Sequence, residues 1–289
     1  MPKISVIMPV YNTNPEYLKQ AAESILNQTF GDFEFIIIND GSTNPDVEKT
    51  IKSYNDKRII YIYQDNKGIA GALNAGLDIA KGELIARMDS DDISLPERFE
   101  KQVKFLDERK DISVLGGWHE YFPKTKIIQT IKTPKFLDFL FFNRISHPTV
   151  MFRRLDFEKY NLRYKPDYKC EDYELWSRAV RYLNFYNLQE VLLKYRVHDN
   201  NYSKPSEGLL NSVKRVQSEM ISFLSDNEEY IDIFKTAFNR APETKNSLLE
   251  NILSIKNDGR SHKVITLLGI KIKFKKEQTA DADKACNPV

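Results

Sequence analysis

The sequence predicts an α/β fold with a mostly parallel central sheet and flanking helices, followed by a C-terminal helical extension. Short apolar runs alternate with helix-periodic segments four times within residues 4–106. Each apolar run ends in a polar turn, and the fourth leads into the carboxylate cluster Asp89-Ser90-Asp91-Asp92. Alternation of this kind is typical of a parallel sheet with helices on both faces, whose turns meet at one edge.

The first four strand–helix units have clear local signals. Buried strands are expected at 4–8, 33–38, 59–63 and 84–88, because short apolar runs bounded by turn residues are typical of parallel strands. Asn14-Pro15 and Asn44-Pro45 each place a capping asparagine before a proline at the first helical position. A third helix is expected from Ile69, and residues 94–97 are interpreted as the capping box of a fourth.

The pattern is less regular after Ile112. Strands are expected at 112–115, 146–152 and 191–197, and an amphipathic helix at 171–183. The composition is helical from Pro205 to about residue 255, and residues 263–276 alternate again.

Composition restricts the class of protein. The 289 residues carry a formal net charge of +2, which gives no reason to expect a nucleic-acid partner. The apolar runs are all shorter than a membrane span, and no N-terminal signal peptide is visible. Cys170 and Cys286 form neither a disulfide framework nor a zinc-binding spacing. We therefore expect a reduced cytoplasmic protein.

The carboxylates after the fourth strand are the strongest functional signal. A buried strand cannot hold three ionised carboxylates, so Asp89, Asp91 and Asp92 are expected just beyond its end, where open α/β sheets bind ligands. Asp-x-Asp offers two hard oxygen ligands to a divalent cation that neutralises a diphosphate. Asp91 is expected on the metal, and Asp89 on a ribose or a metal-bound water. The alternative is a solvated acidic turn that caps the next helix.

The other turns carry weaker candidates, each with a structural alternative. Asp40 can accept a hydrogen bond from an imide or a ribose hydroxyl, or it is an Asx-turn residue before Gly41. Tyr11 can stack on a base or be a buried turn aromatic. The small-residue helix start after Lys67, with Gly71 and Asn74, can admit a phosphate or allow tight helix–sheet packing.

Candidates for a base and for a further metal ligand come from the second half. Asp172 is expected at a helix start and on its inward face, where the helix dipole keeps the carboxylate ionised and suited to deprotonate a sugar hydroxyl. The alternative is an N-cap aspartate. His198, after the last expected strand, can be a third metal ligand. A satisfied surface or core histidine is the alternative, for His198 and for His147 alike.

Taken in order, these motifs resemble those of family 2 glycosyltransferases, the inverting type with the GT-A fold. The resemblance is carried by residues 5–12, 39–42, 66–76, 86–92 with Pro96, 147–153, 171–176 and 195–198. In detail the chain is similar to bacterial enzymes that extend lipopolysaccharide, O-antigen or capsule chains with galactose, glucose or their N-acetylamino forms. Nothing comparable covers Pro205 onward. Many relatives carry a more apolar pair in place of Arg87-Met88, a departure that we interpret as minor.

The resemblance implies a UDP-sugar donor, a saccharide or lipid-linked saccharide acceptor, a β-linked product and Mn²⁺ or Mg²⁺ as cofactor. It assigns Asp40 to the uracil, Asp89 and Asp91 to ribose and metal, and Asp172 to the catalytic base. The full set of expected donor contacts is Pro9, Tyr11, Asp40, Lys67, Gly71, Asn74, Asp89 and Ser90, and the expected metal ligands are Asp91, Asp89 and His198.

Two rival functions are kept. A sugar-nucleotide nucleotidyltransferase would carry a glycine-rich phosphate loop after the first strand, where this chain has Pro9-Val10-Tyr11-Asn12. A catalytically inactive nucleotide-sugar-binding subunit would lack the base, and Asp172 is present.

The predicted organisation is a GT-A domain at 1–204, with a nucleotide-sugar half at 1–116 and an acceptor half at 117–204. A helical extension is expected at 205–258 and a basic segment and tail at 259–289. Within that tail, residues 270–276 alternate apolar residues with lysines. This pattern indicates either peripheral contact with the cytoplasmic face of the inner membrane or an edge strand protected by its lysines.

Overall fold

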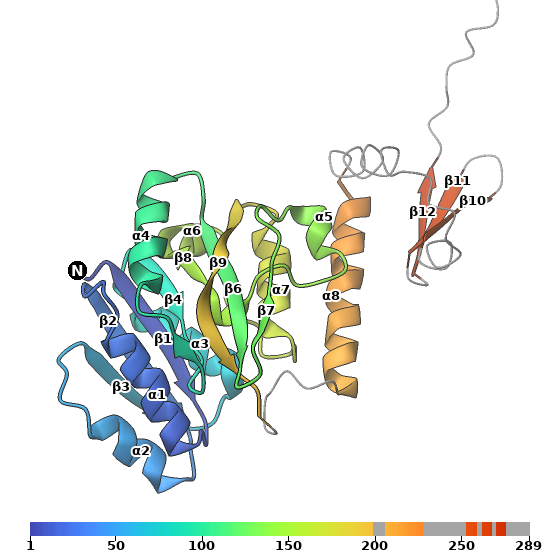
Figure 1. Ribbon diagram of the computed structural model, residues 1–289. Helices are drawn as coiled ribbons and strands as arrows, with labels where there is room; N and C mark the ends of the chain where they lie inside the picture. The colour runs from blue at the N-terminus through green and yellow to red at the C-terminus, as the bar shows by residue number, and fades with distance from the viewer. Residues whose placement is uncertain (199–205, 228–252, 259–261, 268–269, 276–289) are drawn as a thin grey trace, which may run out of the picture. The chain divides into compact units, whose positions relative to one another are not determined.

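The computed structural model describes residues 1–198, 206–227, 253–258, 262–267 and 270–275 (Figure 1). The chain divides into two compact units, Met1–Gln217 and Ser218–Val289. No helix in these described ranges is long and apolar enough to cross a membrane.

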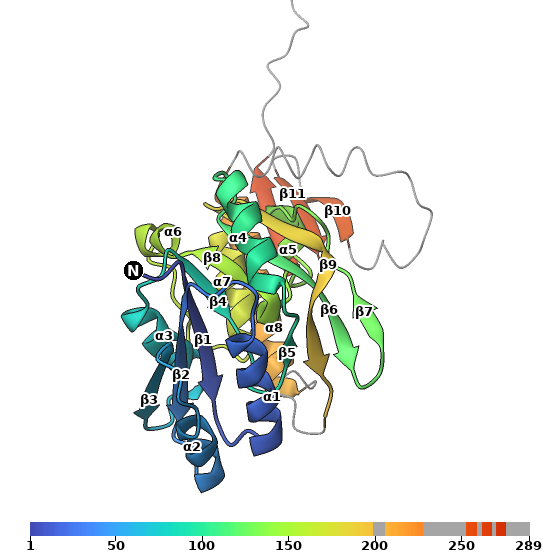
Figure 2. The same ribbon diagram turned by 60° about the vertical axis from the view of Figure 1, so that its left-hand side comes forward.

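The first unit is built on a mixed nine-stranded sheet with the order β3-β2-β1-β4-β8-β6-β9-β5, and β7 pairs with β6. The strands are β1 (Ile4–Val10), β2 (Phe33–Asp40), β3 (Ile59–Gln64), β4 (Leu84–Arg87), β5 (Ile93–Ser94), β6 (Val114–Phe122), β7 (Lys126–Ile128), β8 (Met151–Arg153) and β9 (Phe185–Arg196). Strands β3, β2, β1 and β4 are parallel, and the first three lie side by side in Figure 2. Strand β8 runs antiparallel to β4 and β6, whereas β6 and β9 are parallel. The predicted α/β fold is confirmed.

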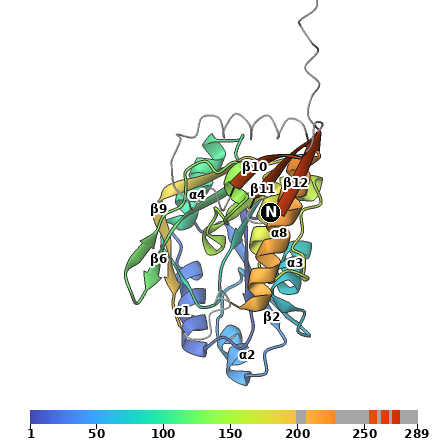
Figure 3. The same ribbon diagram turned by 90° about the vertical axis from the view of Figure 1, so that its right-hand side faces the viewer.

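The helices cover both faces of the parallel half, and α1 and α3 lie on opposite sides of it (Figure 3). They are α1 (Pro15–Leu26), α2 (Pro45–Lys52), α3 (Gly68–Ile79), α4 (Arg98–Glu108), α5 (Phe136–Phe139), α6 (Arg154–Lys159), α7 (Glu171–Ala179) and α8 (Glu207–Ser225), with a 3₁₀ turn at His147–Thr149. Both predicted asparagine caps are present, because Asn14 accepts from the Glu16 N–H and Asn44 from the Asp46 N–H. The caps fix where α1 and α2 leave the sheet edge.

The buried residues on the two faces of the sheet explain how closely the helices approach it. Alternate residues of β1, such as Val6 and Met8, are fully buried in a cluster with Leu18 of α1 and Phe99 of α4. On the other face, a Cβ placed at Gly76 of α3 would lie 2.5 Å from Ile7 Cγ2. A glycine is therefore needed for α3 to pack directly on the sheet, which sets the position of its N-terminus beside the β2 and β3 turns.

Several predicted boundaries were wrong. Ser94 is not the start of a capping box, because it lies in β5, pairs with Leu193 of β9, and α4 begins four residues later without a side-chain cap. The strand predicted at 146–152 is reduced to β8, since a 3₁₀ turn containing Pro148 precedes it. Helix α7 ends at Ala179, earlier than predicted, and β9 extends further toward the N-terminus than 191.

The described part of the second unit contains an antiparallel sheet of β10 (Leu253–Asp258), β11 (His262–Leu267) and β12 (Ile270–Lys275), in that order. The helical extension predicted to residue 258 is therefore wrong over 253–258, where β10 pairs with β11 along its whole length. The alternation that begins at 263 corresponds to β11 and β12. Strand β12 is an edge strand of this sheet, and membrane contact stays a prediction.

Candidate active site

The polar turns of the parallel strands enclose one cleft of about 740 Å³. Its lining residues are Pro9, Val10, Tyr11, Asn12, Thr13, Asn14, Tyr17, Asp40, Asn66, Gly68, Ile69, Ala72, Asp89, Ser90, Asp91, Lys169 and His198. All four turns that the sequence places at this edge contribute to the lining, because parallel strands end on the same side of the sheet.

Side-chain hydrogen bonds hold three of these turns together. The backbone of Asn12 has a left-handed conformation (φ 50°), and its side-chain oxygen accepts from the backbone N–H groups of Thr43 and Asn44 at 2.8 and 3.1 Å. Thr13 and Ser90 share a hydroxyl–hydroxyl bond of 2.6 Å. The turns after β1, β2 and β4 therefore form one connected cleft wall.

Asp40 connects the second and third turns. It is buried, and its Oδ1 accepts from Gln64 Nε2 at 2.6 Å and from the Lys67 backbone N–H at 2.9 Å. Gly41 adopts φ 73°, and a Cβ there would lie 2.8 Å from the Asn66 nitrogen. Neither hydrogen bond uses Oδ2 of Asp40.

Three predicted donor contacts lie outside the cleft lining: Lys67, Gly71 and Asn74. The Asn74 amide binds the Tyr164 backbone instead, donating at 2.8 Å and accepting at 3.0 Å. A Cβ at Gly71 would lie 2.5 Å from Lys67 Cβ, so this glycine permits the turn at the start of α3. The wall beside α3 is made by Asn66, Gly68, Ile69 and Ala72.

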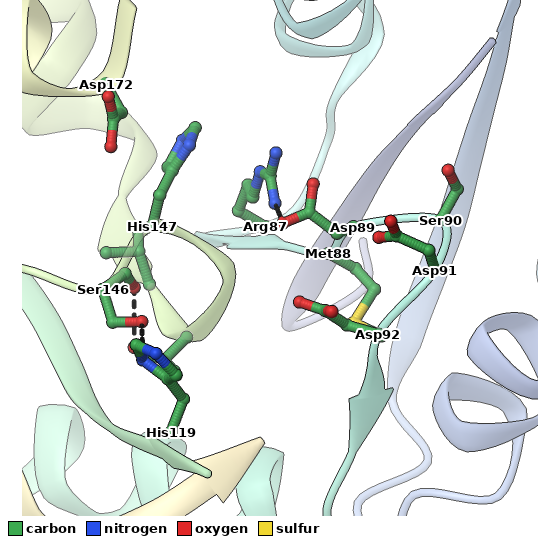
Figure 4. Close-up of polar contacts among 12 residues, drawn as sticks. Arg87, Met88, Asp89, Ser90, Asp91, Asp92, His119, Ser146, His147 and Asp172 are labelled. Atoms are coloured by element: carbon green, nitrogen blue, oxygen red, sulfur yellow. Dashed lines mark hydrogen bonds and ion pairs between the residues drawn. The ribbon is translucent and has the colours of Figure 1, made fainter. Parts of the chain in front are cut away.

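Arg87 is buried at the end of β4 and forms an ion pair with Asp89. Burial lowers the pKa of Arg87, but the neighbouring Asp89 carboxylate outweighs it, and the net pKa is raised. Figure 4 shows Arg87 between Asp172 on one side and Asp91 on the other. Its Nε has no hydrogen-bond partner among the described residues. Arg87 is therefore a central charge of the site, a role that the sequence analysis did not assign to it.

Asp91 and His198 lie side by side in the cleft lining, with Asp91 Oδ2 2.8 Å from His198 Nε2. The pKa of Asp91 is raised by burial and by the charge of Asp89, while His198 opposes the shift. Asp92, in contrast, is fully buried and accepts from the Arg196 backbone N–H at 2.8 Å. Asp92 therefore anchors β9 to the turn, and Asp91 is the carboxylate that faces the cleft.

Asp172 lies in the first turn of α7 and accepts a hydrogen bond of 2.7 Å from Asn143 Nδ2. Burial raises its pKa, although the Tyr173 backbone N–H and Arg87 oppose the shift. The backbone N–H groups at the helix start do lower this pKa, as expected, but burial outweighs them and the net shift is upward. Glu171, 4% exposed, has its pKa raised to about 8 by burial and by Asp172.

His147 is a buried core histidine, which is the structural role that the sequence analysis gave as its alternative. Its Nε2 lies 2.9 Å from Tyr164 Oη, and its ring contacts the edge of Trp176. Burial, and then the charge of Arg87, lower its pKa well below the usual range. It is therefore a neutral packing residue beside the carboxylates.

Comparison of this chain with known proteins shows the family to which it belongs. The family described as Glycosyl transferase family 2 matches residues 5–166, more than half of the chain. This chain belongs to glycosyl transferase family 2. An uncharacterised glycosyltransferase of Methanocaldococcus jannaschii is 36% identical over 217 residues, covering 70% of this chain and 74% of that protein. The O-antigen biosynthesis glycosyltransferase WbnJ of Escherichia coli is 36% identical over 213 residues, covering 70% and 82%.

Solved structures of glycosyltransferases share the fold. TarS 1–349 of S. aureus, in complex with UDP-GlcNAc, has a TM-score of 0.65 at 22% identity over 76% of this chain and 66% of that chain. The mannosyltransferase PcManGT from Pyrobaculum calidifontis, in complex with GDP-Man and Mn²⁺, has a TM-score of 0.54 at 14% identity over 82% and 80%. At these identities the likeness establishes a GT-A-like α/β fold.

The predicted metal ligands of this glycosyltransferase are only partly brought together. Over the described residues, no three acidic, histidine or cysteine side chains are grouped closely enough to hold a metal ion. Asp89 is turned to Arg87, which accounts for its absence from such a group. Asp91 and His198 do fit as two ligands, because a carboxylate oxygen and an imidazole nitrogen lie together on the cleft wall.

Much of the cleft lining was not among the predicted residues, and neither were three charged or amide side chains that bear on the chemistry: Arg87, Asn143 and Lys169. Arg87 lies two residues before Asp89, so the sequence indicated that it is near the turn, but not that it is buried. Asn143 and Lys169 come from loops before α7, where the sequence pattern is least regular. Lys169 and Asp172 both lie beyond the residues that match the family.

Proposed function

We propose that this glycosyltransferase transfers a hexose or N-acetylhexosamine from a UDP-sugar to a saccharide or lipid-linked saccharide acceptor, with inversion to a β-linkage. The sugar is galactose, glucose, GalNAc or GlcNAc, and the pathway class is bacterial surface-polysaccharide synthesis. One observation carries the proposal: Asp40, Asp89 and Asp91 line a single cleft, and the hydrogen-bonded carboxylate of Asp172 lies across Arg87 from them. The name of WbnJ and the UDP-GlcNAc bound to TarS support it.

The donor fits the cleft from the nucleotide end. Oδ2 of Asp40, which neither of its hydrogen bonds uses, would accept from the uracil imide, and the exposed ring of Tyr11 would stack on the base. Asp89, held by Arg87, is a candidate for the ribose hydroxyls. Asp91 and His198 would hold Mn²⁺ or Mg²⁺, which when bound neutralises diphosphate charge.

Asp172 acts as the base in this proposal. Its carboxylate accepts the proton of the acceptor hydroxyl while the acceptor oxygen forms a bond to the anomeric carbon. The bond from that carbon to the β-phosphate oxygen breaks, and UDP leaves with the electron pair. The raised pKa of Asp172 makes it a stronger base than an exposed aspartate. A single base, without a partner nucleophile, favours inversion.

The rival functions find less support. A nucleotidyltransferase needs a glycine-rich phosphate loop after β1, but this turn is shaped by Asn12 and fixed to the β2 turn by its side chain. An inactive binding subunit has no need of a half-buried carboxylate held by Asn143.

A donor panel tests the proposal. The purified chain is incubated with UDP-glucose, UDP-galactose, UDP-GlcNAc, UDP-GalNAc and GDP-mannose in the presence of Mn²⁺, and release of UDP or GDP to water is followed. We expect slow release from one UDP-sugar. Release from GDP-mannose alone would contradict the UDP assignment, and binding without any turnover would favour the inactive subunit.

Cation dependence is a separate prediction. Asp91→Ala should remove the response of turnover to Mn²⁺, because it deletes one of the two cleft ligands, whereas Asp107→Ala on the exposed surface should keep that response. Turnover is measured across a Mn²⁺ titration starting in excess chelator. Full wild-type turnover in the chelator would rule out the metal.

A further inference from the structure

The cleft wall contains a lysine that the function above does not use. Lys169 lies in the loop before α7 and lines the cleft together with Asp89, Ser90 and Asp91. The side chain is exposed, and no residue that the structure describes forms an ion pair with its ammonium group. The other lysine near the cleft, Lys67, is outside the lining. Lys169 therefore brings a free positive charge to the wall that carries the carboxylates.

Helix α8 determines where this lysine is placed. The Lys169 backbone N–H donates to Ser212 Oγ at 3.0 Å, and Lys169 Cγ lies 3.7 Å from a Cβ position at Gly208. The preceding Tyr168 is buried, with the Arg215 guanidinium 4.2 Å from its ring centre. The backbone of Lys169, its side-chain stem and its neighbour Tyr168 are thus all held against α8, while Lys169 itself lines the cleft.

The charges of the cleft define what Lys169 can bind. Asp40 is engaged by Gln64 and Lys67, and Asp89 is neutralised by Arg87. Asp91 is paired with His198. The carboxylates therefore leave Lys169 available to an anionic ligand, and the proposed donor carries its negative charge on the diphosphate.

We propose that Lys169 is the protein's own cation for the diphosphate of the nucleotide-sugar donor, held in place by α8. This inference rests on the proposed function. As the bond between the anomeric carbon and the β-phosphate oxygen breaks, the electron pair moves onto that oxygen, and the Lys169 ammonium stabilises the charge that develops there. A positive charge fixed where negative charge develops lowers the barrier more than it strengthens ground-state binding.

The test uses Lys169→Met, which keeps the length of the stem and removes the charge, and Lys169→Arg, which keeps the charge. Lys104→Met, at an exposed position on α4, is the matched control. Binding of UDP and of uridine to each full-length protein is measured by calorimetry or ligand-observed NMR, because uridine has the base and ribose without the diphosphate.

For Lys169→Met we expect UDP affinity to fall roughly tenfold, uridine affinity to stay at the wild-type level, and Lys169→Arg to recover most of the loss. With the active donor, kcat should fall by roughly 10²-fold, more than the donor KM rises. Unchanged UDP binding, or an equal loss for UDP and uridine, would overturn the inference. If the wild-type protein binds neither ligand, the proposed function itself fails, and the two failures are therefore distinguishable.

Discussion

At the scale of single residues, the positive charge of Arg87 stabilises the carboxylates of both Asp89 and Asp172. It is 3% exposed and pairs with Asp89, and its charge also opposes the burial that raises the pKa of Asp172. Two acidic groups on different elements, one after β4 and one on α7, therefore depend on a single guanidinium. This dependence connects the stability of the fold with the charge state of the proposed base.

Arg87→Met should lower the free energy of unfolding by about 1–3 kcal/mol, because it leaves the part-buried Asp89 carboxylate without its partner. Urea unfolding at neutral pH, followed by circular dichroism, measures the change. Arg109→Met is the control, since its ion pair with Asp111 is on the surface and should contribute little. Equal effects of the two substitutions would show that Arg87 has no special electrostatic role.

Glu171 gives a pH-dependent prediction. Its pKa is raised from 4.5 to about 8, so the folded state binds the proton more tightly than the unfolded state. Its contribution to stability is therefore fully present below about pH 4.5 and is lost as pH rises to about 8. The slope is at most about 1.4 kcal/mol per pH unit. Glu171→Gln should flatten the decline in unfolding free energy across this window.

Urea unfolding at several pH values between 5 and 8 tests this, with Glu108→Gln at an exposed position of α4 as control. A wild-type slope in Glu171→Gln would contradict the assigned cause.

The sequence predicted where residues lie best for acidic side chains at or just after the ends of parallel strands. Asp40 ends β2, and Asp89 and Asp91 lie in the turn after β4, so the geometry of parallel sheets brings all three to one edge. It failed for Lys67 because a lysine beside a glycine-rich helix start suggests a phosphate site, whereas Lys67 contributes only its backbone N–H, to Asp40. Lys169 had no such local signal, since its position depends on a helix about forty residues later in the chain.

At the scale of elements, α8 influences the cleft through the loop before α7. This loop carries Lys169, and Ser212 of α8 accepts a hydrogen bond from its backbone. If Ser212 positions Lys169, Ser212→Ala should weaken UDP binding in the same direction as Lys169→Met but less, roughly threefold, as expected for loss of one neutral hydrogen bond. Calorimetry with UDP measures it. Ser225→Ala, at the other end of α8, removes a bond within the helix and should leave UDP affinity unchanged. Equal affinities in both variants would contradict a positioning role for Ser212.

Helices and strands were predicted correctly where the interactions that form them are between residues close in the sequence. The asparagine caps of α1 and α2 use atoms two residues away, and the sequence located both helices. Ser94 resembled such a cap, but its backbone is paired with Leu193, about a hundred residues later in the chain. The strand at Leu253–Asp258 was missed for the same reason, because it forms only by pairing with β11.

At the scale of the whole first unit, the sheet divides the proposed chemistry between its two halves. The parallel half, from β3 to β4, carries the turns that line the cleft. Between the strands of the other half come α5 and α7; the loop after α5 supplies Asn143, and the first turn of α7 supplies Asp172. The junction is where β8 pairs with β4, and Arg87 of β4 lies there. A donor bound by one half would therefore meet an acceptor activated by the other.

The central claim, that Asp172 is the base of a UDP-sugar transferase, is tested most directly by Asp172→Asn. The variant keeps the size of the side chain and removes its basicity. Turnover and donor affinity are measured on the same preparation with the active UDP-sugar. We predict turnover lower by roughly 10²–10⁴ with donor affinity nearly unchanged. Donor affinity that falls in step with turnover, or turnover that stays at the wild-type rate, would contradict the account.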